Sequence, residues 1–288
     1  MKSIKSYQLE NIDQYAKYMI ESETFEAAMV TSKGGKSENQ DACSISTAID
    51  GTEVFCVADG LGGHAGGRVA SQVAIEAVCK FIQKETFQFE NPQTMLDAFK
   101  VANDSIIARQ KTDIELLEMR STLIIVFIKD SLAFWGHVGD VRLYHIRKQK
   151  VFFQTKDHSV PQMLVDTGDI TQEEIRNHPD RSRLLNSLGD AEKKLKVTIP
   201  QRYQQIEVDD YLHLSTDGFW EWLVESKMIS ILSESQTVLK ATISMAEEVV
   251  SNAEKVEDDY DNLTGLTIKI LSALTNQRYR HKTFYKAL

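Results

Sequence analysis

The hydrophobic pattern of the chain divides into segments with a period near 3.6 residues and shorter apolar runs rich in β-branched and aromatic residues. The first pattern predicts helices at residues 68–82, 95–110 and 237–256, and a further helix is predicted to begin at residue 218. The second pattern predicts strands, at residues 52–59, 121–130, 131–140, 141–149, 150–157, 211–217 and 262–270. Long helices together with clustered strands predict an α+β fold in which helices cover antiparallel sheet.

The four strand-like runs between residues 121 and 157 follow one another with only short turns between them. Parallel neighbours need crossovers of a dozen residues or more, so these runs predict an antiparallel meander. Residues 11–29 predict a polar helix or an irregular lead-in, and residues 159–190 predict a surface insertion with short helical pieces. The chain has only four prolines and no Ser/Gly/Pro-rich linker, which favours one continuous domain.

Charge and composition narrow the classes of function. Lys plus Arg total 33 and Asp plus Glu total 42, a formal net charge of −9. That balance argues against a nucleic-acid-binding protein, because such binding rests mainly on phosphate neutralisation. No apolar run approaches the roughly 20 residues of a membrane helix. The N-terminus lacks a secretory pattern, and the three cysteines form no CxxC pair. A cytoplasmic protein with structural thiols is therefore expected.

The last residues, 273–288, are basic and contain no acid. They predict a solvated tail, with a docking segment as the alternative. The basic side chains of this tail are Arg278, Arg280, Lys282 and Lys286.

A glycine-rich stretch follows the strand predicted at residues 52–59. Residues 60–65 match G-x-G-x-x-A between a strand and a helix, the pattern of a dinucleotide-binding turn. Asp59 would place its carboxylate against an anionic pyrophosphate, and no second parallel strand ending in an acid follows. Nucleotide binding is therefore kept only as an alternative.

Five aspartates each stand at the end of a predicted strand or in a turn beside one. Singly, such a residue is commonly a turn former or a helix cap. Five repeats of the arrangement favour convergence, because strand ends can bring distant carboxylates together. Clustered carboxylates repel unless a cation neutralises them, and hard oxygen ligands suit Mg²⁺ or Mn²⁺ better than zinc. The five are Asp41, Asp59, Asp140, Asp217 and Asp261.

Taken in order, several motifs of the chain resemble the metal-dependent protein phosphatases of type 2C, and the bacterial members most of all. The motifs lie between about residue 33 and about residue 270, with their order and approximate spacing kept. The resemblance implies a β-sandwich of two antiparallel sheets flanked by pairs of helices, with a two-metal site at one end. It also implies a lead-in at 1–25, a catalytic domain at 26–272 with a flap at about 159–182, and the tail at 273–288. The motifs are GKSENQDA, VADGLGGHAGG, MRSTLIIV, WGHVGDVRLYHI, TKDHS, NHPDRSRLLNSLG, LHLSTDGFW and DNLTGLTIKI.

Carried over by motif position, Asp59 resembles the carboxylate that bridges both metals, and the carbonyl of Gly60 binds the second. Asp217 and Asp261 resemble the other carboxylate ligands of the first metal, and Asp41 resembles the acid that holds its waters.

The resemblance extends to a weaker third-metal site and to the acid of the reaction. Asp140, with Asp217, resembles the third-metal site of bacterial relatives. His64 is the candidate that protonates the leaving alkoxide, since imidazole titrates in a useful range; without the resemblance, a helix-start histidine bonded to backbone is the alternative. The implied reaction is Mn²⁺- or Mg²⁺-dependent hydrolysis of phosphoserine or phosphothreonine by an activated water. The implied partner is a phosphoprotein substrate of a serine/threonine kinase, and the chain is expected to act as a monomer without nucleic acid or membrane.

Two positions depart from the family pattern. Lys36 stands where the family usually has an arginine that grips substrate phosphate, and a lysine lacks the bidentate fork. Arg68 or Arg183 could supply a further cation. Gln40 stands where some relatives have an acidic residue, which bears on affinity for the second metal. A metal-binding pseudophosphatase that acts as a regulatory module is therefore the alternative function.

Overall fold

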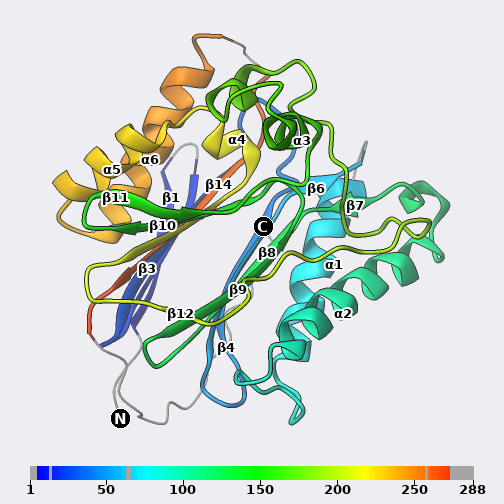
Figure 1. Cartoon of the computed structure of the whole chain (residues 1–288), viewed down its shortest axis with the longest axis horizontal. Coiled ribbons are helices and arrows are strands. Elements are labelled where there is room, and N and C mark those ends of the chain that lie inside the picture. The colour runs from blue at the N-terminus through cyan, green and yellow to red at the C-terminus, as the bar shows by residue number, and fades with distance from the viewer. Residues whose placement is uncertain (1–4, 13–14, 63–65, 257–258, 273–288) are drawn as a thin grey trace.

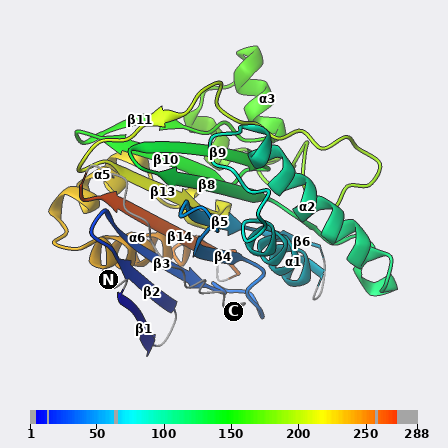
Figure 2. The ribbon, with the colours of Figure 1, turned by 90° about the horizontal axis from the view of Figure 1, so that it is seen from below.

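In the computed structural model the described residues, 5–12, 15–62, 66–256 and 259–272, form two antiparallel sheets that face each other (Figure 1). Helices cover the outer face of each sheet, so the layers follow the order helix, sheet, sheet, helix (Figure 2). The predicted α+β sandwich with flanking helices is confirmed by this arrangement.

One sheet of the described chain has five strands. It is built around two hairpins, and its central strands are apolar on both faces because sheet and helices bury one face each. The order is β12 (Gln204–Gln205), β9 (Leu132–Val138), β8 (Leu123–Lys129), β5 (Glu53–Ala58) and β4 (Ala42–Thr47).

The other sheet has seven strands within the described residues. Its middle strand, β14, pairs with β3 from the N-terminal part of the sequence on one side and with β13 on the other. The order is β1 (Lys5–Ile12), β2 (Tyr15–Glu21), β3 (Phe25–Ser32), β14 (Leu263–Ile270), β13 (Tyr211–Ser215), β10 (Arg142–Arg147) and β11 (Lys150–Gln154).

Two pairs of helices cover the sheets, as the 3.6-residue pattern predicted. The pair α1 (Gly66–Phe81) and α2 (Gln93–Gln110) packs on the five-stranded sheet, whereas α5 (Glu225–Glu234) and α6 (Val238–Ala253) lie outside the seven-stranded sheet (Figure 2). The remaining elements are short: α3 (Val160–Thr167), α4 (Asp217–Trp220), 3₁₀ turns at Ile114–Leu116 and Glu173–Asn177, and the ribbon of β6 (Gly60–Leu61) and β7 (Arg120–Ser121).

The core between the sheets consists of aliphatic and aromatic side chains from both inner faces. Phe25 and Phe55, from opposite sheets, pack edge to face with ring centroids 5.5 Å apart. Similar apolar layers lie between each sheet and its helices. The other members of the central layer include Ile45, Val57, Ile124, Val126, Trp135, Leu143, Leu212, Leu214, Leu266 and Ile268.

The prediction of a helix or irregular lead-in at residues 11–29 is wrong. This part of the chain contains strand β2 and most of β3, with β1 ending inside it. Met19 and Ile20 are buried, and β2 pairs with β3 in antiparallel register. Pairing with distant residues determines the conformation here. Strand β3 pairs on one side with β14, which lies more than 230 residues away in the sequence. On its other side β3 pairs with β2, and the hairpin of β1 and β2 thereby extends the sheet.

The predicted meander is divided between the two sheets. Strands β8 and β9 form a hairpin in one sheet, while β10 and β11 form a hairpin in the other. The chain passes from sheet to sheet at Gly139, whose φ of +96° suits glycine. A Cβ at this position would also lie 2.5 Å from Cγ2 of Thr122. This crossing leaves Asp140 at one end of the sandwich, between the two sheets.

Two predicted features lie outside the described residues: His64 in the glycine-rich turn and the basic segment 273–288. Among the helices that the structure describes, none combines the length and apolar character that crossing a bilayer requires.

Candidate functional site

The register of the strands brings the five candidate aspartates to one end of the sandwich. Ala42 pairs with Ala58, so Asp41 and Asp59 are neighbours just beyond the ends of β4 and β5. Arg142 pairs with Ser215, and the same antiparallel register carried two residues further sets Asp140 beside Asp217. These two pairs come from different sheets.

Asp261 reaches the same end from the start of β14. Ser215 of β13 pairs with Gly265 of β14, and this register brings the residues before β14 close to those after β13. Gly218 packs against the same turn, because a Cβ on it would lie 3.2 Å from the Asp261 Cβ.

A buried hydroxyl links the two sheets at the site. Thr216 donates from Oγ1 to Oδ2 of Asp41 at 3.0 Å, and it accepts a hydrogen bond from the backbone N–H of Thr264 at 3.0 Å. The backbone N–H of Asp41 donates to the side chain of Asn39, which fixes the carboxylate from the other direction. Asp41 is thereby oriented by contacts that are independent of any metal.

Burial and mutual repulsion dominate the electrostatics of the cluster. Burial raises the pKa values of Asp59 and Asp217 well above the usual range, and the neighbouring carboxylates raise them further. Burial also raises the pKa of Asp41 to about 7, although hydrogen bonds from Thr264 and Thr216 oppose the shift. Burial, together with nearby carboxylates, raises the pKa of Asp140 to about 8. Without a cation, these groups hold protons that a divalent ion would displace.

Two buried carboxylate oxygens in the cluster accept no hydrogen bond from the described residues: Oδ1 of Asp41 and Oδ1 of Asp140. A buried carboxylate oxygen without a donor is costly unless it faces a cation.

The backbone packs closely at Gly60, where a Cβ would lie 2.0 Å from the carbonyl oxygen of Gly67 and 2.6 Å from that of Gln40. Only glycine fits there.

The donor set suits a hydrated hard cation. No three His, Cys, Asp or Glu side chains among the described residues lie close enough together to enclose a metal ion. Mg²⁺ usually keeps several of its waters and uses one or two protein carboxylates, so an open cluster of oxygen ligands fits such an ion. The same open cluster does not provide the closed tetrahedral site that structural zinc requires.

A cleft of about 620 Å³ opens beside the cluster and contains Asp261 in its wall. Lys36 lies in the same wall, so the loop with the altered motif position faces the candidate site. Asn262 attaches that loop to the start of β14 by accepting from the Gln40 N–H at 2.7 Å and donating to two carbonyls. The other residues that line the cleft are Ser37, Glu38, Gln40, Asp259 and Asn262.

Sequence reasoning missed a buried ion pair behind the site. Arg142 donates to both carboxylate oxygens of Asp157, at 2.9 and 2.7 Å, and both side chains are about 1% exposed. The guanidinium lies 3.4 Å from the centroid of the Trp220 ring, and Trp220 donates from its indole N–H to the carbonyl of Asp140 at 2.9 Å. Only the arginine two residues after the GD turn signals this contact in the sequence.

Two histidines outside the glycine-rich turn, His158 and His213, make structural contacts. The ring Nδ1 of His158 accepts a hydrogen bond from the Gly139 N–H, and the backbone N–H of His158 donates to the Gly139 carbonyl. His213 is buried, and burial lowers its pKa to about 3. Its Nδ1 lies 3.0 Å from the hydroxyl of Thr267. These contacts give both residues a structural role.

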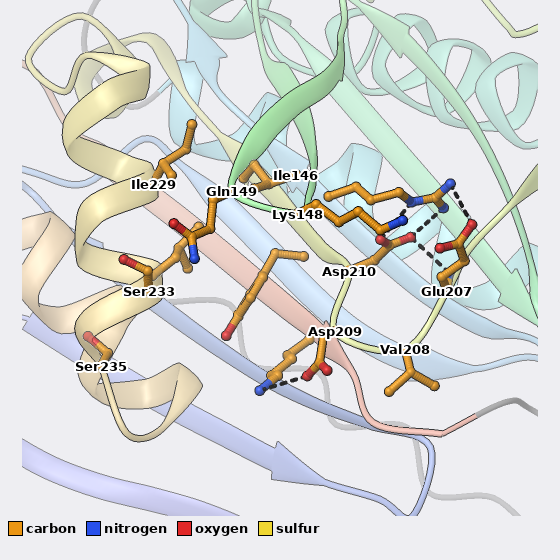
Figure 3. Close-up of a pocket in the computed structure, with 14 residues that line it drawn as sticks. Ile146, Lys148, Gln149, Glu207, Val208, Asp209, Asp210, Ile229, Ser233 and Ser235 are labelled. Atoms are coloured by element: carbon orange, nitrogen blue, oxygen red, sulfur yellow. Dashed lines mark hydrogen bonds and ion pairs between the residues drawn. The ribbon is translucent and has the colours of Figure 1, made fainter.

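A second pocket, of about 340 Å³, lies at the opposite end of the seven-stranded sheet (Figure 3). Its buried acid, Asp210, is already bound by Arg147 at 2.8 and 2.6 Å and by Nε2 of His145 at 2.8 Å. Burial raises the pKa of Asp210, but these hydrogen bonds lower it by more. A carboxylate so fully engaged is a poor metal ligand, so the aspartate cluster is the better candidate site.

Comparison with known proteins identifies the family of the chain. The sequence profile of the family described as "Protein phosphatase 2C" matches residues 33–253, a span that includes every candidate aspartate except Asp261. The serine/threonine phosphatase stp of Listeria monocytogenes is 28% identical over 234 residues, which cover 80% of this chain and 90% of that protein.

Solved structures agree with the fold. The crystal structure of the serine/threonine phosphatase PstP/Ppp of Mycobacterium tuberculosis has a TM-score of 0.74 at 25% identity, covering 86% of this chain and 100% of that one. A structure of the PstP catalytic domain in complex with two manganese ions has a TM-score of 0.72 at 24% identity, covering 86% and 99%. The family profile matches well over half of the chain. The chain therefore belongs to the protein phosphatase 2C family.

Proposed function

We propose that this member of the family is an active protein serine/threonine phosphatase that depends on Mn²⁺ or Mg²⁺. The observation that carries the proposal is the convergence, by strand register, of buried carboxylates whose pKa values are raised by burial and by one another. The names of the curated relatives and the two manganese ions of the PstP structure support it. The implied substrate is a phosphoprotein that a serine/threonine kinase has modified. The cytoplasmic location and monomeric state stay predictions.

The resemblance to the family suggests the ligands of the proposed ions. We assign Asp59 to both ions, the carbonyl of Gly60 to the second ion, and Asp217 and Asp261 to the first. Asp41 would orient water, since Thr216 already holds one of its oxygens and leaves the other free. When bound, such ions lower the pKa of a water between them and neutralise phosphoryl oxygens.

A third, weaker ion is assigned to Asp140 with Asp217. The unpartnered Oδ1 of Asp140 supports this assignment. The carbonyl of the same residue is fixed by the indole of Trp220, so the aspartate is held at its backbone while its carboxylate remains available.

The remaining steps fall to residues around the cluster. Lys36, in the wall of the cleft, is assigned to the substrate phosphate, which it would meet as a point charge rather than as a bidentate fork. His64 is assigned to the leaving group: the serine or threonine alkoxide is strongly basic and needs a proton as it departs.

A pseudophosphatase is the second candidate function, and one observation favours it. Lys36 forms an ion pair with Asp259, and Arg68 forms one with Glu38 at 3.2 Å, so each of these two cations already faces a carboxylate. Phosphate grip would then be weak. A purified chain that binds Mn²⁺ but hydrolyses no phosphate ester would select this candidate.

The proposed function predicts a clear metal dependence. The purified chain should hydrolyse a phosphothreonine peptide with Mn²⁺ or Mg²⁺, lose that activity in EDTA and recover it when Mn²⁺ is added in excess. A parallel sample with Ca²⁺, which tolerates irregular coordination and acidifies water less, should be much slower. Equal hydrolysis in EDTA and Mn²⁺ would contradict the proposal.

His64→Gln is expected to separate two parts of the reaction. The phenolate that leaves p-nitrophenyl phosphate is stable and hardly needs an acid, whereas the alkoxide from a phosphothreonine peptide does. We expect kcat on the peptide to fall on the order of 10²-fold and kcat on the aryl ester to fall much less. The measurement compares the two substrates at matched Mn²⁺ occupancy. Equal losses would mean that His64 is not the acid.

A further inference from the structure

The lysine in the wall of the cleft is held by an acidic residue from a distant part of the chain. Lys36 donates from Nζ to the backbone carbonyl of Asp259 at 2.7 Å and to Oδ2 of the same residue at 3.2 Å. The two residues are 223 positions apart, so the fold creates this contact. Both side chains remain accessible to solvent, with 36% of Lys36 and 79% of Asp259 exposed.

The backbone fixes the lysine at the cleft independently of the carboxylate. Asn262 donates to the carbonyls of Lys33 and Glu38, at 2.8 and 2.9 Å, and so ties the lysine-bearing loop to the start of β14. Gly34 has a φ of +59°, and a Cβ on it would lie 2.2 Å from the carbonyl oxygen of Asp261. The close approach of these two loops keeps the ammonium group at the rim of the cleft.

The two contacts of the lysine have different electrostatic effects. A neutral carbonyl positions the ammonium group and leaves its net charge available to an incoming anion. A carboxylate cancels that charge and also repels an anion that approaches the same group. Exposed ion pairs are weak, so a phosphate dianion can displace the carboxylate, but its binding is weakened by that competition.

We propose that Asp259 lowers the affinity of the cleft for phosphate by competing for Lys36, an inference that rests on the proposed function. Asp259 is then a positioning residue and not a catalytic one. The same competition speeds the release of inorganic phosphate, the product, because the carboxylate re-forms its ion pair as phosphate leaves.

Asp259→Asn in the full-length, Mn²⁺-loaded protein tests the inference. The variant keeps the backbone carbonyl that positions Lys36 but loses the competing charge. We expect KM for p-nitrophenyl phosphate and the inhibition constant of inorganic phosphate both to fall about two- to fivefold, the size of an exposed ion pair, with kcat within twofold. The difference in these two constants between the variant and the wild type should become smaller at high ionic strength. Asp259→Glu, which keeps the carboxylate, should retain values close to those of the wild type.

The chain offers a closely matched control. Lys269 and Asp209 form an ion pair of 3.2 Å with Asp209 76% exposed, at the opposite end of the sheet (Figure 3). Asp209→Asn removes one surface charge, as Asp259→Asn does, and should leave KM and the phosphate inhibition constant unchanged.

A double variant distinguishes competition for Lys36 from a general effect of charge. Lys36→Met should raise KM, and adding Asp259→Asn to it should recover little. If Asp259→Asn lowers KM by the same factor with and without Lys36, the inference is wrong. It is also wrong if Asp259→Asn changes neither constant in an active enzyme. A wild-type protein without phosphatase activity in any metal would instead overturn the proposed function.

Discussion

Asp59→Asn and Asp217→Asn are each expected to lower phosphatase activity on the order of 10³-fold, at any Mn²⁺ concentration, while the fold stays intact. Under the proposed assignment, each change removes a negative ligand from the cluster that would hold the divalent ions. Asparagine is nearly the same size as aspartate, so packing at this end of the sandwich is preserved. The measurement is kcat/KM over a Mn²⁺ titration. An Asp209→Asn control, far from the cluster, should behave as the wild type does.

Although they lower activity, the same variants are expected to be as stable as the metal-free wild type, or more stable, when no metal is present. Burial and neighbouring carboxylates raise the pKa values of Asp59 and Asp217, so the folded protein favours their protonated forms. The stability associated with each group is complete below its unfolded pKa and is lost as pH rises through the folded pKa. Metal-free wild type should therefore lose stability as pH rises from about 4 to neutrality, and the asparagine variants should lose less.

Thermal unfolding in EDTA checks this prediction, and a second scan with Mn²⁺ completes it. At neutral pH the metal-free variants should unfold at the same or a higher temperature than wild type. Mn²⁺ should raise the Tm of the wild type more than that of either variant, because a ligand stabilises only the state that binds it. If a variant retains wild-type turnover at saturating Mn²⁺, its aspartate is not a ligand.

Local pattern predicted most elements of the sandwich, because their signals are strong and short in range. The helices α1, α2 and α6 have apolar residues at helical spacing, and strands such as β5 and β14 are apolar and β-branched. The strands β1, β2, β3 and β4 escaped prediction, and in β2 the reason is that its conformation depends on pairing with β3. The assignment of β9 and β10 to different sheets escaped too, since a GD turn between strands has the same local sequence in a hairpin and in a crossing.

Residue type and position predicted the aspartates of the candidate site, but they did not predict the ion pairs that surround these aspartates. Each aspartate could be recognised because it stands at the end of a strand or in a turn beside one, and the resemblance to a family gave each one an order and a role. The ion pair of Lys36 with Asp259 could not be recognised, since it joins residues 223 positions apart through the register of β14. A fully buried pair such as Arg142 and Asp157 is equally hidden, because charged residues are usually exposed.

The buried pair of Arg142 and Asp157 leads to the largest stability effect expected for a single substitution outside the cluster. Burial lowers the pKa of Arg142, but Asp157 and Tyr144 together raise it by more, so the guanidinium stays charged inside the protein. Asp157→Asn would remove the negative charge that faces the guanidinium, which stacks on Trp220 and, among the other described residues, donates to the hydroxyl of Tyr144 at 3.2 Å. We expect the free energy of unfolding to fall by about 3–5 kcal/mol, as when one partner of a buried ion pair is removed.

Urea denaturation of Asp157→Asn measures this cost, and a double variant shows its origin. In Arg142→Met/Asp157→Leu both charges are replaced by apolar groups of similar volume, so no uncompensated charge remains. Its free energy of unfolding should recover most of the loss, because paired burial of two charges contributes little net stability while an unpaired one is strongly unfavourable. If the double variant were as unstable as Asp157→Asn, the cost would come from lost packing around Trp220 and not from an unpaired guanidinium. If Asp157→Asn lost less than about 1 kcal/mol, the size of an exposed pair, water would have to reach Arg142 in the native state.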